Sequence, residues 1–228
     1  MWLRTLLSRW LTVRCAICAI APAEALVCRG CREDFVASSA QRCTRCAIRL
    51  PSGARLCATC LRHPPHFDAT LALADYATPI DGLIVALKFG HRLELAPVLG
   101  GLLAECARSL GEPRPVLLPV PLAFERLAER GFNQSLEIGR AAARALGARF
   151  DSGALVRVRH AAAQASLRLE ARRRNIRGAF LVRGYVRGLR LAVVDDVMTT
   201  GSTLDEIARV LKAAGAAHVT NLVIARTP

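Results

Sequence analysis

The sequence has few aromatic residues, almost no lysine and no long apolar run. Aromatic residues make up only 5% of the chain, which argues against an extended platform for stacking nucleic-acid bases. Two of the 32 basic residues are lysines, and the rest are arginines. No apolar run approaches the roughly 20 residues of a membrane-spanning helix, so we expect no integral membrane segment. GxxxxGK and GxGxxG are both missing, which excludes the usual P-loop and dinucleotide-binding fingerprints.

Residues 1–14, MWLRTLLSRWLTVR, resemble a secretory signal only superficially. Arginines interrupt the apolar residues, and no cleavage site precedes Cys15. The leucines and one tryptophan fall on one face of a helix. We therefore predict an amphipathic helix that packs on the cysteine-rich segment or touches a membrane surface.

The net charge of +14 is concentrated in one part of the chain, because residues 123–190 contain fifteen arginines and five acidic residues. Within them, residues 159–180 show little strand character and are expected to form a mobile loop, which charge repulsion keeps open. The basic residues at 123–190 indicate a nucleic-acid or polyphosphate partner. A solvated surface in an arginine-rich proteome explains them equally well. The candidate nucleic-acid contacts are Arg172, Arg173, Arg174 and Arg177.

Eight of the nine cysteines form four CxxC pairs: Cys15/Cys18, Cys28/Cys31, Cys43/Cys46 and Cys57/Cys60. Two such pairs supply the four thiolates of a tetrahedral Zn²⁺ site, so we predict two structural zinc sites. A disulfide framework or a redox CxxC fits less well, because the chain lacks a signal peptide and a thioredoxin-like context. The spacing leaves the pairing open between a sequential and a crossed arrangement. The ninth cysteine, Cys106, is expected in the core.

Residues 189–215, LRLAVVDDVMTTGSTLDEIARVLKAAG, predict a strand, a loop and a helix. The short apolar run 191–194 is typical of a strand in a parallel sheet. Thr203 and Glu206 have the spacing of a capping box, apolar residues then repeat at helical intervals, and Gly215 is the expected stop.

The loop of this stretch has the composition of an anion site. Backbone N–H groups, the hydroxyls of residues 199–203 and the helix dipole would all favour a phosphate. Asp195 and Asp196 would repel a phosphate in direct contact. We therefore expect them to face ribose hydroxyls or a Mg²⁺ ion that holds a diphosphate. The stretch predicts a site for a sugar that carries a phosphate.

A second basic loop follows an apolar strand predicted at 115–121. It presents Arg126 and Arg130, whose guanidinium groups suit a diphosphate. A helix is expected from Gln134 to Leu146, and Asn133 and Gln134 would cap it or contact substrate.

The remaining segments alternate strand and helix patterns. Strands are expected at 69–76, 154–158 and 219–225, and helices at 79–89 and 94–110. Lys88, near the end of the first of these helices, is either an exposed surface lysine or a residue that reaches toward pyrophosphate.

Residues 195–203, DDVMTTGST, resemble the phosphoribosyl-pyrophosphate (PRPP) signature of type I phosphoribosyltransferases. Together with the four CxxC pairs, ALKFGHR, PVPLAFERLAERGFNQ and QASLRLEARRRNIRGAF, the chain resembles the competence protein F (ComF/ComFC, GntX-like) family. The resemblance implies an α/β, parallel-sheet type I phosphoribosyltransferase fold at residues 67–228. An N-terminal helix and a double zinc ribbon would precede it at residues 1–66.

The resemblance also implies roles for individual residues. Asp195 and Asp196 would be the catalytic pair that contacts the ribose hydroxyls and the Mg²⁺–PRPP assembly. The 5′-phosphate would bind Thr199, Thr200, Gly201, Ser202 and Thr203, and the pyrophosphate would meet Arg126, Arg130 and Lys88. The chain departs from the family at Ala19 and Ala47, where members often place glycine after a CxxC knuckle.

Three functions are compatible with this resemblance. The first is a cytoplasmic bacterial phosphoribosyltransferase associated with DNA uptake in natural transformation, which releases pyrophosphate as an unknown acceptor attacks the ribose. The second is a non-catalytic protein that senses PRPP or a nucleotide and holds single-stranded DNA for a competence helicase or other uptake proteins. The third is a zinc-ribbon scaffold for protein contacts.

Overall fold

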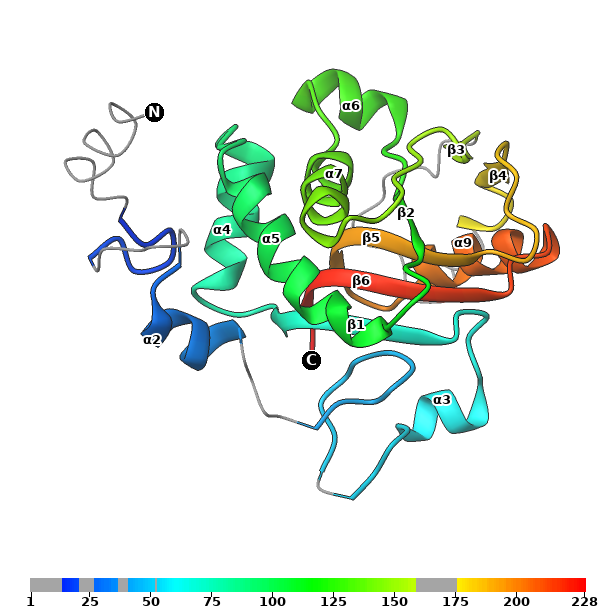
Figure 1. Ribbon diagram of the computed structural model, residues 1–228, viewed down its shortest axis with the longest axis horizontal. Helices are drawn as coiled ribbons and strands as arrows, with labels where there is room; N and C mark the ends of the chain where they lie inside the picture. The colour runs from blue at the N-terminus through cyan, green and yellow to red at the C-terminus, as the bar shows by residue number, and fades with distance from the viewer. Residues whose placement is uncertain (1–13, 21–26, 37–40, 52, 159–175) are drawn as a thin grey trace.

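The computed structural model describes residues 14–20, 27–36, 41–51, 53–158 and 176–228. The centre of this part is a parallel sheet in the strand order β1-β6-β5-β2 (Figure 1). Its strands are β1 (Ala69–Asp75), β2 (Val116–Pro119), β5 (Arg190–Met198) and β6 (His218–Arg226). The inner strands β5 and β6 are almost wholly buried, as expected of parallel strands covered on both faces. The predicted α/β parallel-sheet class is confirmed.

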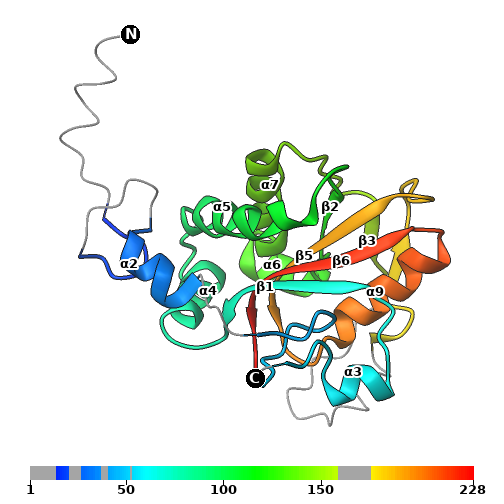
Figure 2. The same cartoon turned by 60° about the horizontal axis from the view of Figure 1, so that its bottom comes forward.

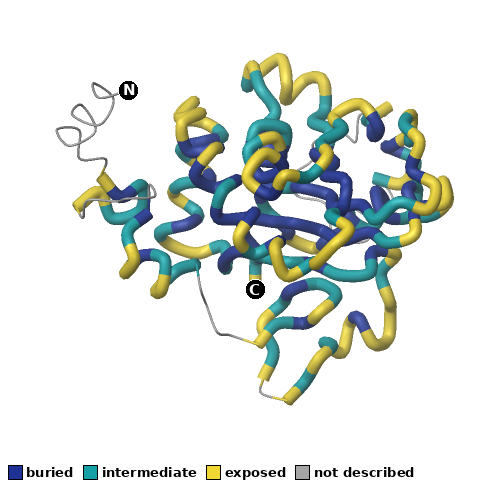
Figure 3. Tube along the Cα trace, viewed as in Figure 1, coloured by how far each residue is buried: buried dark blue, intermediate teal, exposed yellow. Residues whose placement is uncertain are grey.

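Helices cover both faces of this sheet (Figure 2). One face carries α4 (Ile80–Phe89), α5 (Leu95–Ala107) and α7 (Gln134–Leu146), and the other carries α9 (Ser202–Ala213). Side chains of β5 alternate between the two cores: Val194 packs with α5 and α7, whereas Val193 packs with α9. Figure 3 shows that burial is concentrated in the sheet and in the helix faces against it.

Two segments differ from the expected ones. The basic loop before Asn133 contains a short helix, α6 (Phe124–Arg130), which ends where Gly131 adopts a left-handed φ of 78°. Strand β3 (Leu155–Arg157) does not join the parallel sheet but pairs antiparallel with β4 (Phe180–Val182). Most of the predicted mobile loop, with Arg172, Arg173 and Arg174, lies outside the described residues.

The predicted capping box at the start of α9 is wrong. The helix begins one residue before Thr203, with Gly201 at the N-cap and no side-chain cap. Glu206 instead accepts hydrogen bonds from Gly178 N and from Arg209, at 2.8 Å each. Arg209, one turn further along the helix, and the N–H group of Gly178 therefore hold the Glu206 carboxylate away from the N-cap.

The cysteine-rich part contributes only short helical segments: α2 (Arg29–Cys31), η1 (Arg32–Val36) and α3 (Ala58–Arg62). A further turn, η2 (Arg108–Leu110), extends α5. Cys15 and Cys31 pack into the core of α4 and α5, whereas Cys46 packs against the core of α9. The predicted amphipathic helix falls in residues 1–13, outside the described part. None of the described helices has both the length and the hydropathy that a bilayer span requires.

Candidate functional site

The eight paired cysteines form two separate clusters. Cys15, Cys18, Cys28 and Cys31 lie together, as do Cys43, Cys46, Cys57 and Cys60, with the sulfurs of each cluster within 4.8 Å of one another. The arrangement is therefore the sequential one. Tetrahedral Zn²⁺ with Zn–S bonds of about 2.3 Å needs sulfurs about 3.8 Å apart. The separations are 4.0 Å for Cys18–Cys28 and 3.7 Å for Cys46–Cys57, so both clusters could hold zinc.

Backbone N–H groups favour one thiolate in each cluster. Burial opposes ionisation of Cys15, but hydrogen bonds from three N–H groups outweigh it and lower its pKa to about 6. The same balance lowers the pKa of Cys43 to about 7. Burial and the neighbouring thiols raise the pKa of Cys31 and of Cys60. In each cluster four sulfurs lie close together and one of them ionises readily. Such a set of ligands would bind a divalent cation.

The two alanines that depart from the family pattern adopt the backbone that glycine favours. Ala19 and Ala47 both have a φ of 57°. Ala19 N donates to Cys15 O and Ala47 N donates to Cys43 O, each at 2.8 Å, so the two knuckles have the same turn. An L-residue pays about 1–2 kcal/mol for this conformation. The knuckles therefore keep their turn at a cost in strain.

The second cysteine cluster runs alongside β1. Thr70 N, at the start of that strand, donates to Thr44 O at 3.2 Å, and further contacts reach the carboxyl ends of β1, β6 and β5. Arg42, just before its first knuckle, forms an ion pair of 2.7 Å with Asp75 at the end of β1. Arg226, at the end of β6, donates to the carbonyl oxygens of Cys46 at 2.9 Å and of Met198 at 3.3 Å. Parallel α/β sheets bind their ligands at this edge.

At the same edge, three helical side chains converge on the signature aspartates, which lie within β5 and not after its end. Lys88, in the last turn of α4, forms an ion pair with Asp196, whose exposed fraction is 3%. Gln134 Nε2 donates to Asp196 Oδ1 at 3.2 Å, and Ser135 Oγ donates to Asp195 Oδ1 at 2.9 Å. The first turn of α7 and the last turn of α4 therefore hold the pair.

The aspartate pair resists carrying two negative charges. Burial, followed by the charge of Asp196, raises the pKa of Asp195 to about 8, although the Ser135 hydroxyl donates to it. A divalent cation would relieve this repulsion, and carboxylate oxygens are the ligands that Mg²⁺ takes. The residues present therefore fit Mg²⁺.

The signature loop joins β5 to α9. Gly201 has a φ of 78°, and Ser202 N donates to Thr200 Oγ1 at 3.3 Å. Residues 199–204 line a small recess of about 40 Å³ together with Asp195. Because α9 begins at Ser202, the N-terminus of a twelve-residue helix lies at this recess, where an anion is favoured.

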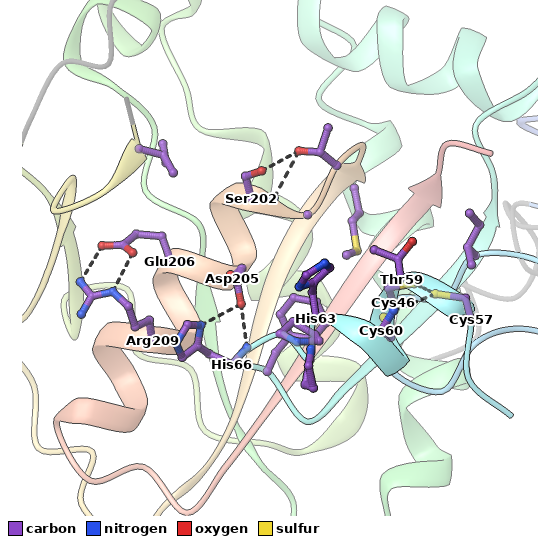
Figure 4. A pocket seen from close by; sticks show the side chains of 18 of the residues that line it. Cys46, Cys57, Thr59, Cys60, His63, His66, Ser202, Asp205, Glu206 and Arg209 are labelled. Carbon is purple, nitrogen blue, oxygen red and sulfur yellow. Dashed lines mark hydrogen bonds and ion pairs between the residues drawn. The ribbon is translucent and has the colours of Figure 1, made fainter. Parts of the chain in front are cut away.

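One cavity of about 340 Å³ brings together most of the predicted site residues. Those that line it are Lys88, Arg126, Arg130, Asp195, Asp196, Thr199 and Thr203. Thr200, Gly201 and Ser202 instead line a second cavity of about 480 Å³, between α9 and the second cysteine cluster (Figure 4). The signature loop thus separates two cavities.

Some residues of the first cavity were not found from the sequence. Asn133 takes the capping role, because its side chain accepts from Ser135 N at 3.0 Å, whereas Gln134 turns toward Asp196. Ser135 was missed, although a hydroxyl in the first helical turn behind a basic loop is a recognisable signal. Arg157 and Tyr76 also line the cavity, and no motif marks them.

Comparison with known proteins identifies the family. The phosphoribosyl transferase domain matches residues 132–228. The DNA utilization protein YhgH of Escherichia coli K12 is 38% identical over 190 residues, which are 81% of this chain and 84% of that protein. Competence protein F of Haemophilus influenzae is 30% identical over 201 residues, 85% and 87% of the two chains. This chain belongs to the competence protein F (ComF/YhgH) family.

Membership of the ComF/YhgH family confirms the resemblance drawn from the signature and the CxxC pairs. The matched domain spans α7, β5, α9 and β6, and so contains the aspartates and the signature loop. The fold is that of a phosphoribosyl transferase domain, a parallel sheet with helices on both faces. The two four-cysteine clusters precede the matched domain and are compatible with a double zinc ribbon.

Proposed function

We propose that this ComF/YhgH protein binds PRPP in the 340 Å³ cavity, with the 5′-phosphate in the 40 Å³ recess that shares Asp195, Thr199 and Thr203 with it, and transfers the phosphoribosyl group to an acceptor. The observation that carries the proposal is the convergence of two carboxylates with Lys88, Arg126 and Arg130 on one cavity beside a helix N-terminus. PRPP presents the complementary groups: a 5′-phosphate, two ribose hydroxyls and a pyrophosphate.

Each part of PRPP has a matching surface. Residues 199–203 with the start of α9 bind the 5′-phosphate. Asp195 and Asp196 accept hydrogen bonds from the ribose hydroxyls. The guanidinium groups of Arg126 and Arg130, with Lys88, neutralise the pyrophosphate. Mg²⁺, held at the aspartates with PRPP, would supply further neutralisation of the leaving group.

Transfer requires the bond between ribose C1 and the pyrophosphate oxygen to break. Its electron pair leaves with pyrophosphate, whose developing charge the two arginines stabilise. An acceptor nitrogen forms the new bond to C1 and loses its proton. The aspartates stabilise the positive charge that the ribose carries during transfer.

The proposal is tested by titrating PRPP and Mg²⁺ into zinc-loaded protein by calorimetry and by measuring pyrophosphate release. The double variant Asp195→Asn/Asp196→Asn should lose PRPP binding, whereas Asp81→Asn, in α4 away from the cavity, should retain it. Asp196→Asn alone should abolish pyrophosphate release without unfolding the protein. Wild-type protein that binds no PRPP would overturn the proposal.

A second function is favoured by a different surface and by the names of the relatives. Tyr185 is 79% exposed, between the exposed Arg183 and Arg187. An aromatic ring flanked by cations suits a stacked base and its phosphates. We propose that this surface holds single-stranded DNA, whether or not transfer occurs. Arg177, the described one of the predicted nucleic-acid contacts, precedes β4 and lines the 480 Å³ cavity instead.

DNA affinity should fall steeply with salt, because each neutralised phosphate contributes a slope of about 0.7 in log K against log salt. Tyr185→Ala should weaken binding of a single-stranded oligonucleotide at all salt concentrations, and Arg183→Gln should reduce the slope. Arg144→Gln, on the exposed side of α7, is the control and should change neither. Salt-independent binding would count against this function.

A further inference from the structure

The second cysteine cluster is hydrogen-bonded to the residue that precedes the phosphate loop. Arg226, whose exposed fraction is 8%, spans the Cys46 carbonyl at 2.9 Å and the Met198 carbonyl at 3.3 Å. Met198 is the last residue of β5, and its carbonyl also accepts from Thr227 N at 3.1 Å. Both lone pairs of this carbonyl are therefore used, one of them by a side chain that also holds the cluster.

Met198 directly precedes the loop and also packs against it. A Cβ atom on Gly201 would approach Met198 Cε to 2.5 Å, so the loop backbone rests directly on that side chain. A displacement of Met198 would therefore displace the loop. Interiors packed this closely transmit shifts and do not absorb them.

A second link reaches the other end of the loop. His66 N and His66 Nδ1 lie 2.7 and 3.0 Å from Asp205 Oδ1, in the first turn of α9 (Figure 4). His66 lies in the segment that follows the last ligand, Cys60. The phosphate loop is thus bracketed by two links to the second cluster and the segment that leaves it.

The first cluster has no comparable link among the described residues. Its neighbour Arg32 forms an ion pair with Glu105 in α5, and Cys15 and Cys31 pack into the core on the opposite face of the sheet from α9. Both clusters nevertheless have the same local build: Cys28 and Cys57 precede their short helices with ψ values of 159°. The difference between the clusters lies in what they touch.

We propose that the metal-loaded second cluster sets the position of the phosphate loop through Arg226, and thereby sets the affinity of the loop for a sugar phosphate. Arg226 is a positioning residue, because it acts through Met198 and does not line the PRPP cavity. The choice of ribose 5-phosphate as the ligand that reports the effect rests on the proposed function. The coupling between the cluster and the loop is expected in ligand-free protein as well.

The first experiment separates the two metal sites. Cys57→Ser and Cys28→Ser should each lower the zinc content from two ions to one per chain, as measured by mass spectrometry. Cys57→Ser should weaken calorimetric binding of ribose 5-phosphate about tenfold, the size of an ordinary coupling between sites. Cys28→Ser should have a much smaller effect. Equal losses in the two variants would overturn the proposal.

The second experiment tests Arg226 with a matched arginine. Arg190 also spans two carbonyls, Pro113 O at 3.0 Å and Leu110 O at 2.8 Å, at the far end of β5. In ligand-free protein, Arg226→Met should increase hydrogen exchange of the amides at 199–203 about tenfold, whereas Arg190→Met should leave them unchanged. Exchange at the loop that does not change in Arg226→Met would refute the coupling.

The third readout is the reciprocal one, because coupling between two sites acts in both directions. Saturating ribose 5-phosphate should slow the release of one of the two zinc ions to a chelator in the wild type, but not in Arg226→Met. If the wild type binds no ribose 5-phosphate, the proposed function fails, and the exchange experiment alone decides the coupling. If it binds but neither zinc ion is affected, the coupling is wrong and the proposed function stands.

Discussion

Lys88 and Asp196 form an ion pair in the wall of the 340 Å³ cavity, and both side chains are largely buried, with exposed fractions of 19% and 5%. Lys88 therefore neutralises the Asp196 carboxylate, to which Mg²⁺ would bind. Lys88→Met should lower the free energy of unfolding by about 3 kcal/mol, because a buried carboxylate loses its cation. Mg²⁺ should restore more stability to this variant than to the wild type, as measured by chemical denaturation.

The other lysine is the control for that experiment. Lys212 pairs with Asp68 at 2.6 Å, where both side chains are about a third exposed. Lys212→Met should cost less than about 1 kcal/mol, as exposed ion pairs do, and should show no added response to Mg²⁺. Equal Mg²⁺ responses in the two variants would mean that Asp196 is not a metal ligand.

The raised pKa of Asp195 makes stability depend on pH. The carboxyl binds its proton more tightly in the folded protein than in the unfolded chain, where its pKa is near the ordinary 3.8. The folded state therefore holds more protons between about pH 4 and pH 8, and this contribution to stability is lost as pH rises through that window. Melting temperatures should show the decline.

Asp195→Asn is the test of that assignment, because asparagine has the same shape but does not titrate. The variant should show a flatter dependence of melting temperature on pH than the wild type. If the two profiles are parallel, the decline comes from other groups.

Gly201→Ala should weaken ribose 5-phosphate binding at least about tenfold, because small displacements of a binding group are costly. The new Cβ would meet Met198 Cε at 2.5 Å, in addition to the strain at a φ of 78°. Gly188→Ala is matched in backbone: its φ is 72°, but nothing lies within 4 Å of the added carbon. Backbone strain should cost both variants about 1–2 kcal/mol of stability, the contact with Met198 should add to the loss in Gly201→Ala, and only Gly201→Ala should lose affinity.

Ala19→Gly should stabilise the protein by about 1 kcal/mol, because it removes left-handed strain at an exposed position. Ala47→Gly should gain less, since Ala47 is only 1% exposed and glycine leaves out a buried methyl group. Thermal unfolding of zinc-loaded protein measures both. A greater gain at Ala47 would contradict this balance.

The sequence predicted those features that depend on neighbouring residues in the chain. The CxxC spacing predicted which cysteines lie together in clusters, and the pattern around Gly201 predicted a strand, a loop and a helix. Neither pattern specifies distant contacts, so the sequence left the pairing of the knuckles open and missed the hydrogen bond from Ser135 to Asp195. The capping box failed for the same reason, because Glu206 is held by Gly178 from a segment 28 residues away in the chain.

The aspartates illustrate a subtler limit. Hydrophobic runs end at the first charged residue, so the pattern placed the end of the strand before Asp195. In the structure the backbone pairing of β5 continues to Met198, because the ladder depends on the partner strand and not on side-chain polarity. The same continuation brings Met198 next to Arg226, a contact for which no local pattern exists.

The strand order has a consequence for how the protein is made. The last strand in the chain, β6, lies in the middle of the sheet and carries Arg226, whereas the second cysteine cluster is synthesised long before it. The surface against which the second cluster packs is therefore incomplete on the ribosome until β6 has been synthesised. The cluster could fold around zinc before then, but its hydrogen bond to Arg226 can form only afterwards.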